Sequence, residues 1–171
     1  GNLVVDACQT QDAVNGLFND WLSGFTYSGG CDPDPSFGET PTAPDACGGQ
    51  TTVTYTVTDI CHNPAPCTGT FTVEPPDPLV VEAPEQVTLD ACVVLTQNEI
   101  DTQFAAWIAQ FSVEGGCTAQ LPDLSGYSAP LLCEGGTVNI AFEINDLCDQ
   151  DAVDVSFIVV EPDPITYTPP S

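Results

Sequence analysis

The chain has 171 residues, no Lys or Arg and 25 Asp plus Glu, so its formal net charge is −25. Because no cation is available to neutralise phosphates, this composition excludes nucleic acid as a partner and argues against an anionic membrane surface. No apolar run is long enough for direct membrane insertion. Hydrophobic residues make up 42% of the chain and recur in patterned runs, which favours folded modules with modest cores over disorder.

In chain order, the first expected elements are a strand at residues 3–5 and a helix that begins after Thr10. A Thr hydroxyl can accept a hydrogen bond from a free N–H of the first helical turn, so Thr10 is a candidate N-cap. Apolar residues then follow at helical spacing up to Phe25, which predicts one buried helical face. A loop rich in Pro, Gly and Ser leads to alternating residues 52–58 and then to residues 70–73, both of which we expect to be strands.

The same order of residues recurs in the second half of the chain, which indicates an internal repeat. A second strand is expected at residues 86–89, a second helix after Thr96, and further strands within residues 137–144 and 153–160. In this copy Glu99 lies three residues after Thr96, as in a capping box. The recurring positions are Phe18 and Phe104, Trp21 and Trp107, Phe25 and Phe111, Cys8 and Cys92, Cys31 and Cys117, Cys47 and Cys133, and Cys61 and Cys148.

Each copy ends in a Pro-rich stretch, at residues 74–78 and at residues 161–164, which we call the Pro-rich closers. Such stretches are typical of short stiff linkers. We therefore expect a first module at residues 1–78, truncated at its N-terminus, and a second module at residues 79–164. Residues 165–171 would begin a following module, so the chain is expected to be a piece of a longer array. Strands bounded by turns, with one inserted helix, predict a mostly β fold and a small β-sandwich in each module.

The run at residues 51–59, followed by residues 67–73, resembles the end of an HYR-type, immunoglobulin-like repeat. The preceding Thr-Gln helix and Gly-Gly-Cys turn resemble a variant found in very large surface adhesins of Bacteroidota, some of them associated with gliding motility. The second copy departs from this pattern, because Val153 stands near the place of the second hairpin cysteine. The resemblance implies two tandem, disulfide-bonded immunoglobulin-like β-sandwich modules, an extracellular location at the cell surface and a structural or adhesive role.

Nine cysteines indicate an oxidising compartment. The four cysteines of the second copy allow three pairings, of which we favour one that closes the loop after the helix and ties the first strand to the hairpin. By analogy the first copy pairs in the same way and leaves Cys67 over; Cys67 could instead pair with Cys8 or Cys61, and a spare thiol could link neighbouring chains. The favoured pairs are Cys117–Cys133, Cys92–Cys148, Cys31–Cys47 and Cys8–Cys61.

The density of carboxylates leaves two interpretations open: a solvated acidic surface without specific sites, and calcium as a cofactor, since calcium takes six to eight hard oxygen ligands. No stretch matches an EF-hand loop, so the prediction rests on the crowding of acidic residues alone. The candidate ligands are Asp32, Asp34, Asp146, Asp149 and Asp151.

No catalytic residues are predicted, and we expect the protein not to be an enzyme. The single histidine, His62, lies in a predicted turn, whereas a catalytic triad needs a buried and oriented imidazole. Carboxylate pairs at glycosidase separation would arise by chance among 25 acidic residues, and nothing distinguishes one of them.

The leading hypothesis is a structural spacer or stalk repeat of a large adhesin or surface filament, with adjacent repeats of the same protein as its partners. One rival is an adhesive module that recognises a glycan or a protein through the loop aromatics Tyr27, Tyr127 and Phe37. Another rival is a self-assembling filament in which residues 165–168 donate a strand to a neighbour.

Overall fold

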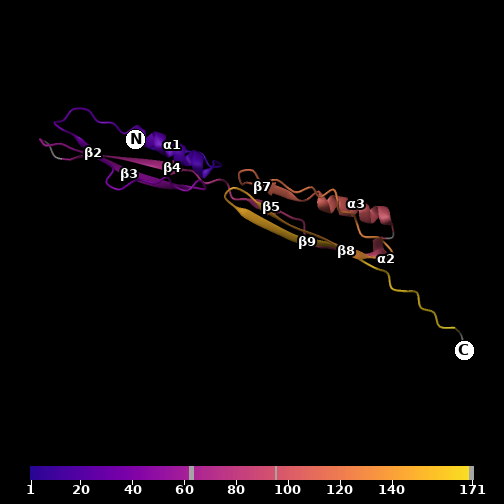
Figure 1. Cartoon of the computed structure of the whole chain (residues 1–171). Coiled ribbons are helices and arrows are strands. Elements are labelled where there is room, and N and C mark those ends of the chain that lie inside the picture. The colour runs from indigo at the N-terminus through magenta and orange to yellow at the C-terminus, as the bar shows by residue number, and fades with distance from the viewer. Residues whose placement is uncertain (62–63, 95, 170–171) are drawn as a thin grey trace. The chain divides into compact units, whose positions relative to one another are not determined.

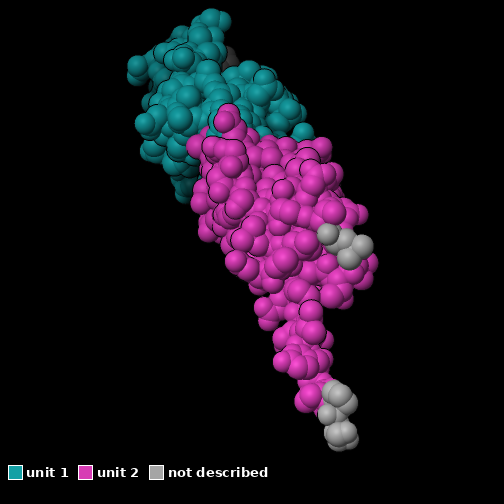
Figure 2. All heavy atoms as spheres, turned by 90° about the vertical axis from the view of Figure 1, so that its right-hand side faces the viewer, with its two compact units in different colours: residues 1–78, 116–118 teal, residues 79–115, 119–171 magenta. Residues whose placement is uncertain are grey.

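The computed structural model describes residues 1–61, 64–94 and 96–169, and its fold is mostly β with a few short helices and several sheets (Figure 1). The chain forms two compact units, which Figure 2 colours separately. Unit 1 comprises Gly1–Pro78 together with Gly116–Thr118, and unit 2 comprises Leu79–Gly115 together with Ala119–Ser171. Each unit has its own sheet and its own hydrophobic core.

Unit 1 contains one four-stranded sheet in the order β1-β4-β3-β2. Strands β3 and β4 form an antiparallel hairpin, whereas β1 adds to β4 in parallel, with Leu3 opposite Phe71. The short strand β2 pairs with the far half of β3. The elements are β1 (Leu3–Val5), α1 (Gln11–Ser23), β2 (Asp34–Ser36), β3 (Gly49–Thr58) and β4 (Ala65–Val73).

Helix α1 packs its apolar face on this sheet, as the helical spacing predicts. The hydroxyl of Thr10 caps the helix by accepting a hydrogen bond from the N–H of Ala13 at 3.3 Å, which confirms the predicted N-cap. Val14 and Phe18 are fully buried, and the Phe18 ring meets Phe71 of β4 edge-to-face with centroids 5.3 Å apart. One apolar stripe of the helix therefore closes the core of unit 1.

Unit 2 repeats this pattern of pairing. Its larger sheet has the order β6-β9-β8, with β8 and β9 antiparallel and β6 parallel to β9. A second, two-stranded sheet pairs β5 with β7. The elements are β5 (Val80–Glu82), β6 (Val87–Asp90), α2 (Ala91–Val94), α3 (Gln97–Ile108), β7 (Ser112–Glu114), β8 (Gly136–Asn145) and β9 (Gln150–Val160).

Helix α3 takes the role of α1. Thr96 accepts the N–H of Glu99 at 3.3 Å, so the second predicted N-cap is also confirmed. The capping box is not reciprocal, because the Thr96 N–H donates to the Val94 carbonyl and not to Glu99. Phe104 packs edge-to-face on Phe157 of β9 at 5.1 Å, and the buried Trp107 donates its indole N–H to the Glu85 carbonyl at 2.8 Å.

Candidate functional site

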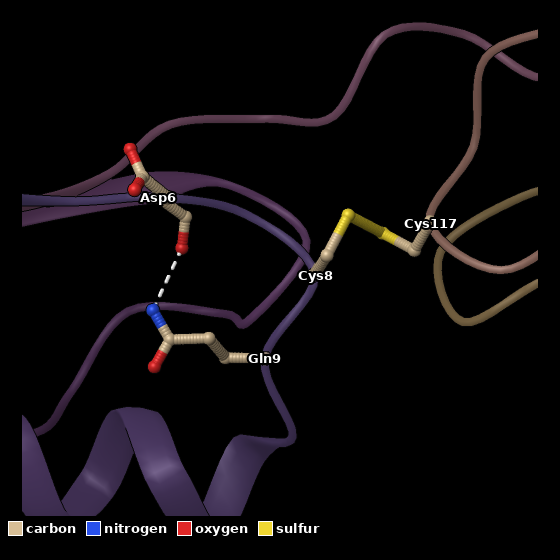
Figure 3. Close-up of a disulfide and its surroundings, with 4 residues drawn as sticks. All are labelled: Asp6, Cys8, Gln9 and Cys117. Carbon is tan, nitrogen blue, oxygen red and sulfur yellow. Dashed lines mark hydrogen bonds between the residues drawn. A yellow bond between two sulfur atoms is a disulfide. The ribbon is translucent and has the colours of Figure 1, made fainter.

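A disulfide joins Cys8, just after β1, to Cys117 in the Gly116–Thr118 segment of unit 1 (Figure 3). Their Cα atoms lie 5.1 Å apart, although the two residues are 109 positions apart in sequence. Cys8 has a φ of 67°, and the neighbouring Gln9 amide donates a hydrogen bond to the Asp6 carbonyl at 2.9 Å across the same turn. The bond therefore connects a residue of the first sequence copy to a residue of the second.

The four favoured cysteine pairs are wrong. Cys8 bonds Cys117 and not Cys61, and Cys117 does not bond Cys133. Cys47 and Cys148 are also disulfide-bonded, although the partners predicted for them are free. The free cysteines are all exposed: Cys31, Cys61, Cys67, Cys92 and Cys133.

The length of the hairpin explains why the predicted pairs cannot form in unit 1. Cys47 precedes the first residue of β3 and Cys61 follows its last, so about ten residues of strand, roughly 30 Å, separate them. Cys8 lies at the Cys47 end, because Val5 of β1 is opposite Val73, which is itself opposite Gly49. A disulfide spans a Cα separation of only about 4.4–6.8 Å, so Cys8 cannot reach Cys61.

At the opposite end of the hairpin, one carboxylate holds the backbone of two free cysteines. Oδ2 of Asp59 accepts the N–H of Cys31 at 2.9 Å, and Oδ1 accepts the N–H of Cys61 at 2.6 Å. Asp59 thereby fixes both cysteines at the same end of unit 1, with their side chains exposed. Charge-assisted hydrogen bonds of this kind are about twice as strong as neutral ones.

The glutamine that begins α1 and the one that begins α3 fix the loops that lead into Cys47 and Cys133. Gln11 accepts the N–H of Ala46 at 2.9 Å and donates to the Pro44 carbonyl at 3.0 Å, next to Cys47. Gln97 makes the same two bonds, to the N–H of Leu132 at 2.8 Å and to the Pro130 carbonyl at 3.1 Å, next to Cys133. The sequence analysis did not predict this role of the two glutamines. The available signal was the Thr-Gln pair that recurs in both copies.

The predicted calcium ligands are spread through the fold. Asp32 adopts a left-handed φ of 57°, and Asp34 lies in β2. The Asp146 N–H donates to the Asp149 carbonyl at 2.8 Å. Within the described ranges, no three His, Cys, Asp or Glu residues are grouped so as to hold a metal ion.

Two of these aspartates anchor the strand that opens unit 2. The Asp149 carboxylate accepts the N–H of Leu79 at 3.2 Å, and the Asp151 carboxylate accepts the N–H of Val81 at 2.9 Å. The second oxygens accept the N–H groups of Gln150 and Ala152. These carboxylates therefore act as hydrogen-bond acceptors for backbone groups of β5 and β9.

The pKa of one carboxyl group, that of Asp123, is shifted. Hydrogen bonds from the side chain and backbone of Ser125 lower the pKa of Asp123 below its usual value, because they favour the charged form. Asp123 is fully exposed and lies in the long loop between β7 and β8.

A cavity of about 440 Å³ opens on unit 1 between residues 26–30 and the ends of β3 and β4 that flank their turn. Of the loop aromatics considered for binding, Tyr27 lines this cavity and is 48% exposed. Phe37 packs between Phe25 and Tyr55, and Tyr127 lies on the surface of unit 2. His62 falls outside the described residues.

No protein-family model matches the chain, and no curated protein matches it at a significant level. Where the structure describes the chain, its helices lack the length and apolar character needed to cross a bilayer.

Proposed function

We propose that this chain is a structural spacer: a stretch of tandem repeats that extends an adhesin or surface filament away from a cell. The observation that carries the proposal is the same helix-on-hairpin pattern in both units, together with the Cys8–Cys117 disulfide between residues of successive copies. A disulfide that spans 109 residues limits how far the chain extends under tension. A limit on extension is a property that a load-bearing stalk requires.

The proposal includes an extracellular location and an immunoglobulin-like character for each module. Disulfides persist in oxidising surroundings, which supports the location. The Thr-rich hairpin and the Pro-rich closers at residues 74–78 and 161–164 support the comparison with extracellular β repeats. In this proposal, the net charge of −25 keeps densely packed surface stalks apart by mutual repulsion.

Electron microscopy of genetically fused copies tests the spacer role. Proteins with one, two and four fused copies of residues 1–164, produced with their disulfides formed, should give particles whose length grows in proportion to copy number. Particles that grow in all dimensions, or that collapse into compact bodies, would refute the role. Antibodies against the chain should also label intact cells of the source organism without permeabilisation.

Self-assembly by strand donation is a second candidate, and one observation favours it. The segment after the second Pro-rich closer has two large apolar side chains exposed to solvent: Ile165 is 95% exposed and Tyr167 is 88% exposed. An extended segment with alternating apolar residues can add to the sheet of another molecule.

A further inference from the structure

The ladder between β2 and β3 brings the loop after α1 to the end of the β3–β4 hairpin. The two strands are antiparallel, and Asp34 of β2 lies opposite Thr58 of β3. In an antiparallel pair, each step back along one strand is matched by a step forward along the other. Three such steps lead from Asp34 and Thr58 to Cys31 and Cys61. The register of the ladder, continued past its end, therefore sets these two cysteines opposite each other.

The contacts of Asp59 show that the two segments stay together beyond the end of the ladder. One carboxylate oxygen accepts the N–H of Cys31 at 2.9 Å, and the other accepts the N–H of Cys61 at 2.6 Å. The backbone nitrogens of the two cysteines are therefore no farther apart than one carboxylate group and two hydrogen bonds. Gly30 permits this approach, because a Cβ at that position would lie 2.9 Å from Oδ2 of Asp59.

This separation suits a disulfide between the two cysteines. Residues that face each other in an antiparallel pair have Cα atoms about 4.5–5.5 Å apart, and a disulfide spans a Cα separation of about 4.4–6.8 Å. Both Cys31 and Cys61 are free and exposed, so a dissolved oxidant can reach them. Because Asp59 already holds both backbones, one thiol has a high effective concentration near the other.

Cys67, the remaining free cysteine of unit 1, is placed less well for a bond with Cys61. It lies in β4 opposite Tyr55 of β3. Three further residues of β3 follow Tyr55 before the strand ends at Thr58, which is roughly 10 Å of strand. Cys67 therefore lies back along the hairpin, at a distance that a disulfide does not span.

The second copy differs at the element that carries this arrangement. Residues 120–122, which align with β2, are not in a strand. The cysteine that precedes them, Cys117, is therefore not tied to a hairpin by such a ladder, and it bonds Cys8. The cross-strand position of Cys31 and Cys61 is thus a feature of the first copy, and it depends on β2.

We propose that Cys31 and Cys61 are a disulfide-forming pair, which ties the loop after α1 to the end of the β3–β4 hairpin within unit 1. A sulfur–sulfur bond replaces two S–H bonds, and two protons and two electrons pass to a small-molecule disulfide such as glutathione disulfide, which leaves as two thiols. The bond goes beyond the spacer role, since its formation depends on unit 1 alone. In a chain under tension, it would keep the segment between the two cysteines from extending.

Two matched variants of the whole chain test the pair, both with Cys92→Ser and Cys133→Ser. The first also carries Cys67→Ser and retains Cys31 with Cys61, whereas the second carries Cys31→Ser and retains Cys61 with Cys67. Titration in glutathione redox buffers, followed by alkylation and intact-mass measurement, gives the effective concentration of each thiol pair. This concentration should be at least about 100-fold higher in the first variant than in the second.

Peptide mapping locates the bond in the parent chain. Chymotrypsin cleaves after aromatic residues, and Tyr27, Phe37, Tyr55 and Phe71 delimit one peptide with Cys31 and another with Cys61. Without reduction, peptide 28–37 should be found linked to peptide 56–71. Reduction should separate the two peptides.

A substitution of Asp59 tests the carboxylate that holds the two cysteines. Asp59→Asn leaves a single acceptor oxygen for two N–H groups, so the effective concentration in the first variant should fall at least about tenfold. Glu39→Gln removes the same charge from an exposed position of unit 1 and should change that concentration by no more than about twofold.

Four results would overturn the proposal: free thiols in the first variant under excess glutathione disulfide, equal effective concentrations in the two variants, a parent-chain bond from Cys31 or Cys61 to another cysteine, or equal effects of Asp59→Asn and Glu39→Gln. The electron-microscopy series on fused copies is judged by particle length. The spacer role and the Cys31–Cys61 bond can therefore fail independently of each other.

Discussion

Removing the Cys8–Cys117 bond should lengthen the chain that is available under force by a predictable amount. The clean comparison uses a protein in which these are the only two cysteines and the other seven are changed to Ser. With the bond intact, the segment between the two cysteines, which are 109 positions apart in sequence, cannot extend when the termini are pulled. A fully extended chain spans about 3.3–3.6 Å per residue, so Cys8→Ser should release roughly 360–390 Å of additional contour length.

Single-molecule force spectroscopy measures this difference directly, as the contour length after both units have unfolded. The matched control is the two-cysteine protein after reduction, which should reach the same length as the Cys8→Ser variant. Equal contour lengths for the oxidised parent and the Cys8→Ser variant would mean that Cys8 and Cys117 are not bonded, and the load-limiting argument would fail.

Four further results are expected. Phe157→Ala should destabilise unit 2 by about 3–5 kcal/mol, because a fully buried ring is lost; amide exchange confined to unit 2 measures this, and a change below about 1 kcal/mol would contradict the packing. Gln97→Ala should cost about 1–3 kcal/mol by leaving partly buried backbone groups unpaired, with the exposed Gln110→Ala as a neutral control. Ser125→Ala should raise the pKa of Asp123 towards its usual value in an NMR titration, and an unchanged pKa would rule out Ser125 as the cause. Since the lowered pKa favours folding above the unfolded-state pKa, this small contribution is lost as pH falls through the folded-state value. Calorimetric titration with millimolar calcium tests the predicted cation binding, which should give a saturable heat. That heat should disappear when all five candidate ligands are changed to Asn: Asp32, Asp34, Asp146, Asp149 and Asp151.

Much of the local structure could be predicted from the sequence, because its signals are local. Three signals each act over a few neighbouring residues: the hydroxyl caps at Thr10 and Thr96, apolar residues at helical spacing, and alternating β-branched residues. The corresponding helices and hairpins are present in the structure. The short elements β2, β7 and α2 were missed. Each has only three or four residues, which is too short for a periodic pattern, and β2 and β7 form by pairing with distant segments.

The disulfides mark the limit of sequence reasoning. The sequence by itself determined that the chain is a twofold repeat, acidic throughout, and that all its cysteines except Cys67 stand at equivalent positions in the two copies. Only the tertiary structure decided which cysteines meet. The length of the β3–β4 hairpin places Cys47 and Cys61 at opposite ends of unit 1, while folding brings Cys117 next to Cys8 across 109 residues. A disulfide depends on distance in space, and proximity in sequence carries little information about it once a ten-residue strand lies between two cysteines.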